Sequence, residues 1–228
     1  MAKRIGILGG ISHESTIRYY KYILRKYYAA RRDYHYPEVV IFSLDFQKST
    51  EFEESGDFDG YIAYLLSGIQ ALKNAGAEFA VIAANSPHSV FDALSSRAGI
   101  PLISIVEEAA KAAQRHNLKK LLLTGIKFTM QSPFYGDVFR KYGMDVITPD
   151  ESEQDEINRV IYKELVIGVF RPETRKRLLE IIHRYEVDGV ILGCTELSLI
   201  LNQEDTSLRL LNTLDLHARS ALDYALRD

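Results

Sequence analysis

The chain has 228 residues, of which 46% are hydrophobic and 26% are charged, a mixture typical of soluble globular proteins rather than disordered or fibrous ones. Its 28 lysines and arginines against 31 aspartates and glutamates leave a formal net charge of −3, which argues against a basic nucleic-acid-binding surface. The single cysteine excludes an internal disulfide and a cysteine-based zinc site, so it is either a small buried hydrophobe or a reactive thiol.

The first residues, Met1-Ala2-Lys3-Arg4-Ile5, lead almost directly into an apolar strand rather than into the long apolar region of a signal peptide. The longest apolar runs elsewhere are shorter than the roughly 18 residues that a membrane span requires. We therefore expect a cytoplasmic protein with neither a membrane nor a nucleic acid as its partner.

Short apolar runs, often β-branched, alternate along the chain with longer segments of helical spacing. In chain order, the predicted strands lie near Arg4–Leu8, Val39–Leu44, Phe79–Ala84, Pro101–Ile105, Lys120–Thr124, Asp145–Thr148, Gly189–Gly193 and Leu208–Leu211. The amphipathic segments between them include Thr16–Tyr28, Gly60–Ala75, Glu107–Arg115 and Glu173–Tyr185. This alternation predicts an α/β fold with parallel sheets covered by helices on both faces.

The two halves of the chain resemble each other. Three segments of the first half, Ile7–Ile11, Ala80–Asn85 and Leu102–Ser104, are similar in the same order to Leu122–Ile126, Val190–Thr195 and Leu210–Asn212 of the second. The nearly constant spacing of these pairs indicates a duplication, and hence two similar lobes with parallel four-stranded sheets. Ligands on parallel sheets bind beyond the carboxyl ends of the strands, so we expect a site where those ends face each other across a cleft.

The glycine-rich segment Gly6-Ile7-Leu8-Gly9-Gly10 follows the first predicted strand and precedes a helix. Its spacing differs from the G-x-G-x-x-G of dinucleotide-binding folds, and no acidic residue ends the next strand in the expected place. A tight strand-to-helix turn that uses the backbone freedom of glycine is the better interpretation, and no nucleotide cofactor is predicted.

The segment Gly193-Cys194-Thr195-Glu196 places the only cysteine at the end of a strand, with Cys194 or Thr195 beginning the next helix. The positive end of a helix dipole would lower the pKa of the Cys194 thiol, and the free N–H groups of the first turn could hold a carboxylate. A buried strand-end cysteine followed by a capping Thr195 explains the same residues equally well.

The matching segment of the first half is Ala84-Asn85-Ser86-Pro87-His88. Asn85 or Ser86 can cap a helix, and Pro87 is tolerated in a first turn. His88 alone is more typical of a hydrogen-bonded structural histidine than of a catalyst. The six histidines lack the H-x-H and H-E-x-x-H spacings of metal sites, so no metal is predicted.

These motifs together resemble the aspartate/glutamate racemase family over essentially the whole chain. The resemblance is carried by Gly6–Gly10 with Glu14-Ser15-Thr16, Asn85–His88, Thr129-Met130, Phe134-Tyr135, Gly193–Glu196 and Asp215–Ala218. It implies two α/β lobes related by a pseudo-twofold axis, with the active site in the cleft between them. It also suggests that residues 1–100 with 209–228 form the first lobe and residues 101–208 the second.

The chemistry implied by the resemblance is cofactor-independent racemisation, in which two cysteines serve opposite faces of the α-carbon. Cys194 matches the second of them, with Glu196 and His88 as its candidate partners in acid–base work. At the position of the first cysteine the chain has Ala84, which cannot carry a proton. Solvent, Ser86 or His88 would have to replace it.

The resemblance also implies a set of substrate contacts. Asn85, Ser86 and Thr195 would hold the α-carboxylate and ammonium groups, Thr124 and Thr129 belong to a hydroxyl-bearing loop, and Lys48 is the nearest cation for a side-chain carboxylate. Lys163, on a helix, is expected to be solvated.

We therefore expect a racemase that moves the α-proton of a small acidic amino acid or related dicarboxylate with Cys194, acting as a homodimer. Two alternatives stay open because the chain has one thiol. It could be a lyase resembling the one-cysteine arylmalonate decarboxylases, or a catalytically silent protein that binds carboxylates.

Overall fold

The computed structural model describes residues 2–227, which form two compact units. The residues up to Ile105 together with those from Leu214 onward form unit 1, and Val106–Thr213 form unit 2. The chain thus passes from one unit to the other at the amino-terminal ends of two helices, α5 and α11.

Unit 1 contains a four-stranded parallel sheet in the order β2-β1-β3-β4. Its elements are β1 (Ile5–Gly9), α1 (His13–Arg31), β2 (Val39–Ser43), α2 (Phe46–Ser55), α3 (Phe58–Asn74), β3 (Phe79–Ile82), the short 3₁₀ helix η1 (Ser86–Val90), α4 (Phe91–Arg97), β4 (Leu102–Ile103) and, at its end, α11 (Thr213–Ala225).

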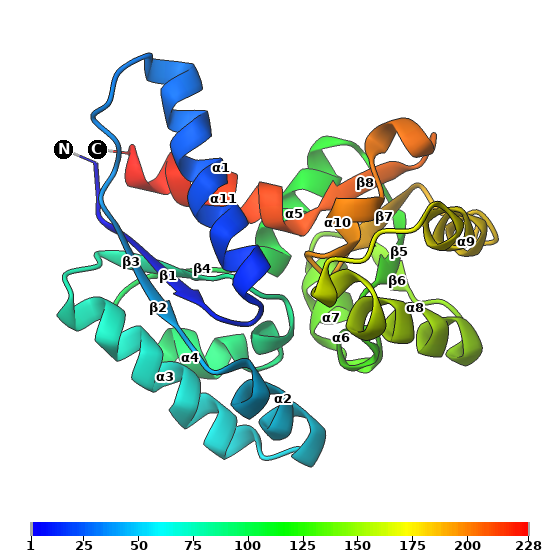
Figure 1. The fold of residues 1–228 in the computed structure, drawn as a ribbon, viewed down its shortest axis with the longest axis horizontal. Helices are drawn as coiled ribbons and strands as arrows, with labels where there is room; N and C mark the ends of the chain where they lie inside the picture. Colours follow the sequence, from blue (N-terminus) through cyan, green and yellow to red (C-terminus); the bar gives the residue numbers. More distant parts are fainter. Residues whose placement is uncertain (1, 228) are drawn as a thin grey trace. The chain divides into compact units, whose positions relative to one another are not determined.

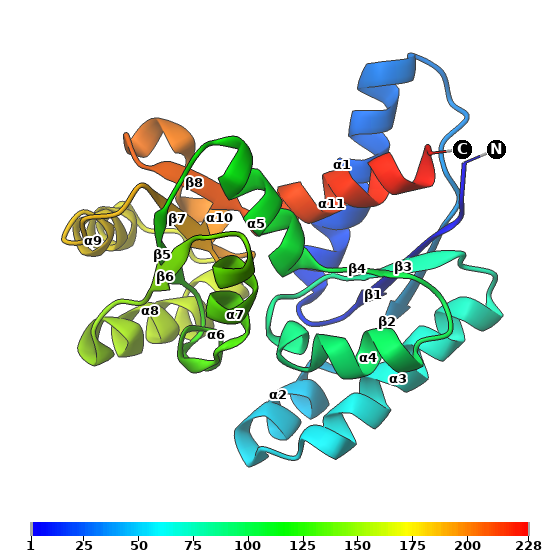
Figure 2. The same ribbon diagram turned by 180° about the vertical axis from the view of Figure 1, so that it is seen from behind.

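Alternation along the strands builds two apolar layers in unit 1. Ile5 and Ile7 of β1 point to one face, where they pack with α1 and α11. Leu8 of β1 points to the other face and packs with α3 and α4. Figures 1 and 2 show these helix pairs on opposite sides of the sheet. The residues of α1 and α11 that complete the first layer include Tyr19, Ile23, Leu214, Ala218, Ala221 and Leu222.

Unit 2 repeats the same topology, with a parallel sheet in the order β6-β5-β7-β8. Its elements are α5 (Ile105–Arg115), β5 (Lys120–Thr124), α6 (Lys127–Gln131), α7 (Phe134–Lys141), β6 (Asp145–Ile147), α8 (Glu151–Lys163), η2 (Leu165–Ile167), α9 (Pro172–Ile182), β7 (Gly189–Leu192), α10 (Leu197–Ile200), η3 (Gln203–Asp205) and β8 (Arg209–Asn212).

The core of unit 2 is built in the same way as that of unit 1. Leu122 of β5 and Val190 and Leu192 of β7 point to one face, where they pack with apolar residues of α8, α9 and α10. The residues that alternate with them, such as Leu121 and Ile191, are fully buried and point to the opposite face. The prediction of an α/β fold with two similar four-stranded parallel sheets is confirmed.

The expected lobe boundaries are wrong at two strands. The strand near Pro101–Ile105, assigned to the second lobe, is β4 and pairs with β3 in the first sheet. Residues 209–212, assigned to the first lobe, form β8 and pair with β7 in the second sheet. In each case the strand stays beside the parallel strand that precedes it in the chain, and the chain leaves the unit only after that pairing is complete.

Candidate active site

Three loops of unit 1 leave the same edge of its sheet, because β1, β2 and β3 are parallel neighbours. The Leu44 N–H donates to the Gly9 carbonyl at 2.9 Å, and the Ala83 N–H donates to the Leu8 carbonyl at 2.8 Å, which keeps the strand ends together. The loops carry the glycine pair Gly9-Gly10, the start of α2, and the segment Ala84–His88. Most candidate residues of the first half therefore lie at one edge.

The glycine pair forms a tight turn. A Cβ atom on Gly9 would clash with the Thr16 side chain, and Gly10 has a φ of +89° with the Leu44 carbonyl where its Cβ would be. The Thr16 hydroxyl accepts from the Gly10 N–H at 2.9 Å and donates to the Ser12 carbonyl at 2.9 Å. The space beside these glycines is filled by Thr16 and Leu44, which agrees with the interpretation as a turn.

The segment Ala84–His88 is buried, and Ala84 belongs to the apolar cluster that contains Leu44 and Tyr61. Residues Ser86–Val90 form η1, with Pro87 in its first turn as the sequence indicates. The expected cap is wrong, because no side-chain hydrogen bond from Asn85 closes the turn. The alanine methyl thus fills an apolar position where the resemblance expects a thiol.

His88 holds this segment in place through both ring nitrogens. Its Nδ1 lies 3.1 Å from the Ala84 carbonyl, which can only accept, so Nδ1 carries the proton. Its Nε2 accepts from the Ile105 N–H at 3.1 Å. Burial, together with the nearby His217 ring, lowers the pKa of His88 to about 3. The structure therefore places His88 as a neutral positioning residue, with no ring nitrogen left to exchange protons with a substrate.

His217 continues the same network from α11. Its Nε2 donates to the Ile103 carbonyl at 2.9 Å, and its Nδ1 accepts from the Tyr19 hydroxyl at 2.8 Å. Burial lowers the pKa of His217 to about 4. Helices α1 and α11 are thereby joined to Ile103 of β4, two residues before the Ile105 N–H that the His88 ring accepts.

Helix α2 brings to this edge a carboxylate that the sequence motifs do not reveal. Glu53 is half-buried, accepts from the Tyr61 hydroxyl at 2.7 Å, and is hydrogen-bonded by the Ser86 hydroxyl. Burial raises the pKa of its carboxyl, and the two hydroxyls lower it in part. Its spacing from the buried Ser49 is the signal that could have identified it, because residues four apart share a helix face.

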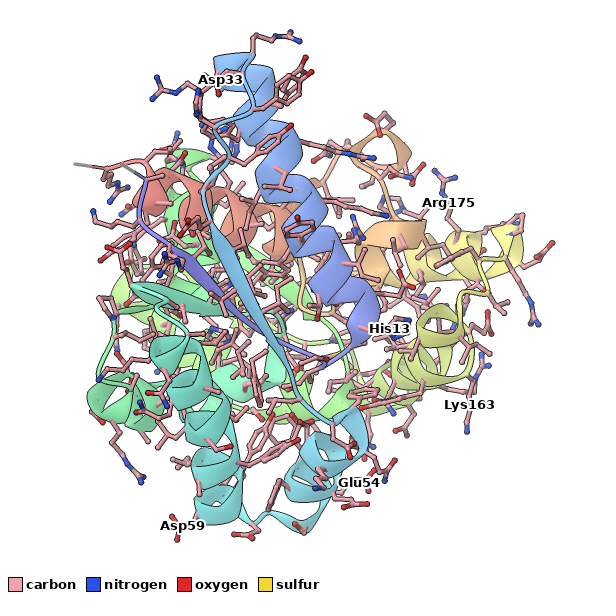
Figure 3. The ribbon with its side chains drawn as sticks, turned by 60° about the vertical axis from the view of Figure 1, so that its left-hand side comes forward. His13, Asp33, Glu54, Asp59, Lys163 and Arg175 are labelled. Atoms are coloured by element: carbon pink, nitrogen blue, oxygen red, sulfur yellow. The ribbon has the colours of Figure 1, made fainter. Side chains whose placement is uncertain are left out.

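The two lysines considered in the sequence are both exposed. Lys48 lies in the first turn of α2, next to the buried Ser49, and Lys163 ends α8. Figure 3 shows Lys163 extending outward from that helix. The solvated position expected for Lys163 is therefore confirmed, whereas Lys48 is not held against Ser86 as Glu53 is.

In unit 2 the ends of β5 and β7 approach closely. The Gly193 N–H donates to the Thr124 carbonyl at 2.7 Å, and a Cβ on Gly193 would lie 2.7 Å from that same carbonyl oxygen. The Thr124 hydroxyl donates to the Ile191 carbonyl at 3.0 Å. Thr124 thus fixes the strand end that precedes Cys194, and glycine at position 193 permits the approach.

Cys194 is paired with an acid. Its Sγ lies 3.0 Å from Oε2 of Glu196, and the same oxygen accepts from the Thr195 hydroxyl at 2.8 Å. Burial and the Glu196 carboxylate raise the pKa of the Cys194 thiol well above its usual value. The structure therefore keeps Cys194 as a protonated thiol beside a buried carboxylate.

The expectation of a thiol activated by a helix dipole is wrong. Helix α10 has four residues and begins at Leu197, three positions after the cysteine. The dipole of so short a helix is small, and burial beside a carboxylate acts in the opposite direction. Glu196 is the residue before the helix, so Thr195 does not cap it.

Thr129 has a buried hydroxyl with no hydrogen-bond partner among the described protein groups. The residue is fully buried on α6, and its Oγ1 makes no hydrogen bond to any described protein group. Its Cγ2 lies 3.5 Å from the position that a Cβ on Gly193 would take, so it borders the turn that carries Cys194. A buried hydroxyl without a protein partner is uncommon and calls for an explanation such as a bound water, an ion or a role in the chemistry of a site.

Among residues 2–227 there is no group of three or more His, Cys, Asp or Glu side chains that could hold a metal ion. Within the same residues, none of the helices is both long and apolar enough to span a membrane. The side chains gathered at the two sheet edges are instead hydroxyls, carboxyls and one thiol, a set suited to proton transfer.

A family model described as Asp/Glu/hydantoin racemase matches residues 8–221. The chain belongs to this family. The match includes strands of both sheets, the segment Ala84–His88 and the Cys194–Glu196 turn, so the resemblance stated from the motifs is confirmed.

Individual relatives agree with this assignment. The broad specificity amino-acid racemase RacX of Bacillus subtilis (strain 168) is 25% identical over 230 residues, which cover 96% of each chain. The structure of an aspartate racemase homologue from Pyrococcus horikoshii OT3 is 34% identical with a TM-score of 0.87 and covers 100% of both chains. Picrophilus torridus aspartate racemase, at 20% identity and a TM-score of 0.77 over 98% of this chain and 94% of its own, shares the fold.

Proposed function

We propose that this racemase-family chain is a cofactor-independent amino-acid racemase in which Cys194 carries the α-proton. The observation that supports it most directly is the 3.0 Å contact between Cys194 Sγ and Glu196 Oε2. A thiol that is kept protonated can give its proton to a substrate carbanion, and the thiolate that this leaves can take a proton in the reverse direction.

The substrate would be held by the polar groups around the two sheet edges. Asn85 and Ser86 in unit 1, with Thr195 in unit 2, are the proposed partners of the α-carboxylate and ammonium groups. The unsatisfied Thr129 hydroxyl is a further donor or acceptor for them. We propose a small acidic amino acid as substrate, with Lys48 as the cation for its side-chain carboxylate.

A lyase reaction is the second candidate, and the protonated state of Cys194 favours it. A thiol with a raised pKa is suited to giving a proton to a carbanion, which is the step that follows loss of carbon dioxide from a substituted malonate.

Proton NMR in heavy water tests the proposal. The protein is incubated with each enantiomer of aspartate, glutamate and other amino acids, and loss of the α-proton signal is measured. We expect exchange by wild type and a loss of about a hundredfold or more in Cys194→Ala. Absence of exchange with every amino acid, at high protein concentration and long times, would refute the racemase. Carbon dioxide release from disubstituted malonates would then identify the lyase.

The assembly and location are part of the same proposal. By its resemblance to the racemase family we propose a homodimer that acts in the cytoplasm. Sedimentation equilibrium of the purified chain measures the oligomeric state, and a monomer at micromolar concentration would contradict the proposed homodimer.

A further inference from the structure

Helix α1 carries a stripe of positive charge that the overall composition does not reveal. Between His13 and Arg31 the helix has five lysines and arginines but only one acid, Glu14 in its first turn. Four of the cations are spaced three, four and one residues apart, which places them along one side of the helix. These four are Arg18, Lys21, Arg25 and Lys26. The net charge of −3 for the whole chain conceals this local excess.

The stripe lines a pocket of about 460 Å³ whose residues all belong to unit 1. Figures 1 and 2 show α1 lying beside α11, and α11 contributes Asp215 to the pocket. Besides the four cations and Asp215, the lining consists of Tyr22 and Ala29 of α1. A volume of this size is usual for a site that binds a small molecule. We call it the basic pocket.

The charges within the basic pocket do not balance. Asp215 is half-buried, and Arg18 and Lys26 lower the pKa of its carboxyl, which burial raises. The next acid along α11, Asp223, is paired with Arg219 at 2.8 Å. Four positive charges and one negative charge therefore leave the pocket with an excess of three positive charges.

Two of these cations have no protein partner. Lys21 and Arg25 are exposed, and neither makes an ion pair or a hydrogen bond with any residue between 2 and 227. Like charges four residues apart on a helix repel each other and destabilise it. Lys26 stays near the stripe because its Nζ lies 5.3 Å from the centre of the Tyr22 ring. The arrangement is unfavourable for the helix alone and becomes favourable when an anion lies among the cations.

We propose that the basic pocket binds a small anion that carries a diphosphate group. The guanidinium groups of Arg18 and Arg25 can each bind a phosphate through paired N–H bonds, and the two lysines add compact positive charges. Two adjacent phosphates concentrate several negative charges in a small volume, which complements the excess of three positive charges. The stripe is roughly 12 Å long, so a single small ligand can reach all of it. This inference does not depend on the proposed racemase function.

A ligand in the basic pocket would join two helices that already contact each other. Arg18 precedes Tyr19, whose hydroxyl donates to Nδ1 of His217 at 2.8 Å, and Asp215 lies two residues before that histidine. A ligand that binds the folded protein and not the unfolded chain raises Tm. Binding is therefore expected to stabilise the packing of α1 against α11.

Isothermal titration calorimetry of the whole chain tests the proposal, with sodium pyrophosphate as the probe. About 0.15 M NaCl is present, because salt screens the weak attraction of anions to exposed charges. We expect saturable binding at one site per chain and a rise in Tm. Citrate, which has three carboxylates and no phosphate, is expected to bind about tenfold more weakly. ADP distinguishes the two sources of the group, since tighter binding of ADP than of pyrophosphate identifies a nucleoside diphosphate.

Arg25→Gln removes one cation of the stripe, and Arg31→Gln is its matched control. We expect Arg25→Gln to weaken pyrophosphate binding about tenfold. Its Tm without ligand stays constant or rises, because the exposed Arg25 side chain repels Lys21. Arg31 is exposed in the last turn of α1 and does not line the pocket, so Arg31→Gln retains the affinity. Asp215→Asn removes the opposing negative charge and is expected to tighten binding.

The contrary outcomes are equally specific. Absence of saturable binding at about 1 mM pyrophosphate overturns the inference. An equal loss of affinity in Arg25→Gln and Arg31→Gln also overturns it, because the helix as a whole and not the pocket would then attract the anion. Binding of citrate as tightly as pyrophosphate overturns the assignment of the ligand to phosphates. None of these measurements uses turnover, so they are unaffected if the racemase proposal fails.

Discussion

The Sγ atom of Cys194 lies 3.0 Å from Oε2 of Glu196, two residues further along the chain. The Thr195 hydroxyl donates to the same oxygen at 2.8 Å, so one carboxylate oxygen accepts hydrogen bonds from both the thiol and the hydroxyl. Because burial and this negative charge both oppose the thiolate, they keep the Cys194 side chain in its protonated form.

Replacement of Glu196 by glutamine tests that relationship. Glu196→Gln keeps the shape of the side chain but removes its charge, so we expect the pKa of the Cys194 thiol to fall. The pH dependence of alkylation by iodoacetamide measures it, since only the thiolate reacts. Glu204→Gln, at an exposed position of η3, is the control and leaves the profile unchanged. A midpoint that stays the same or rises would contradict the pairing.

The buried hydroxyl of Thr129 gives a second test. Since Oγ1 has no described protein partner, Thr129→Val removes no hydrogen bond, and we expect the free energy of unfolding to stay constant or to increase by about 1 kcal/mol. We expect the KM for the substrate to rise. Urea unfolding measures the free energy of unfolding, and the rate of α-proton exchange at several substrate concentrations measures the KM.

Thr124→Val is the matched comparison for Thr129→Val. It removes the hydrogen bond to the Ile191 carbonyl and is expected to lower the free energy of unfolding by roughly 0.5–1.5 kcal/mol. Equal destabilisation by both variants would show that the Thr129 hydroxyl is structural.

The strands and the candidate turns follow from the sequence because they depend on local patterns. Apolar runs identify all of the described strands to within about two residues, a margin usual for element boundaries. The Gly193–Glu196 turn is identified by its motif. Glu53 is not identified by any motif. In the sequence Glu51, Glu53 and Glu54 look like a solvated acidic run, and only the packing of α2 shows that Glu53 is the one that is partly buried.

Properties that depend on partners distant in sequence are harder to predict. Which sheet β4 and β8 join is decided by pairing with β3 and β7. The direction of the Cys194 pKa shift depends on where α10 begins and on the orientation of the Glu196 side chain, and neither follows from the motif.

The charge preference of the site is tested at Lys48. If its ammonium binds the side-chain carboxylate of the substrate, Lys48→Ala raises the KM for aspartate about tenfold while kcat changes little. Lys73→Ala, at an exposed position of α3, is the control. Steady-state kinetics with aspartate and alanine measure this effect. An equal rise in KM for both substrates would show that Lys48 does not bind the side-chain carboxylate, because alanine has none.

The buried histidines predict how stability depends on pH. The pKa values of His88 and His217 in the folded protein are lowered to about 3 and about 4, whereas an unfolded histidine titrates near 6.5. The unfolded chain therefore binds protons that the folded chain does not as the pH falls below about 6.5. Each histidine stabilises the fold fully above that pH and loses up to about 1.4 kcal/mol of its contribution per pH unit below it.

His88→Gln makes this prediction specific. The variant is less stable at about pH 7.5, because it loses the bonds to Ala84 and Ile105, but its free energy of unfolding falls less steeply between about pH 6.5 and pH 5. Urea unfolding at several pH values measures the slope. His13→Gln, at the exposed start of α1 that Figure 3 labels, keeps the wild-type slope. The same slope in His88→Gln as in wild type would mean that His88 accepts a proton in the folded protein, and its ring would then be free to act on a substrate.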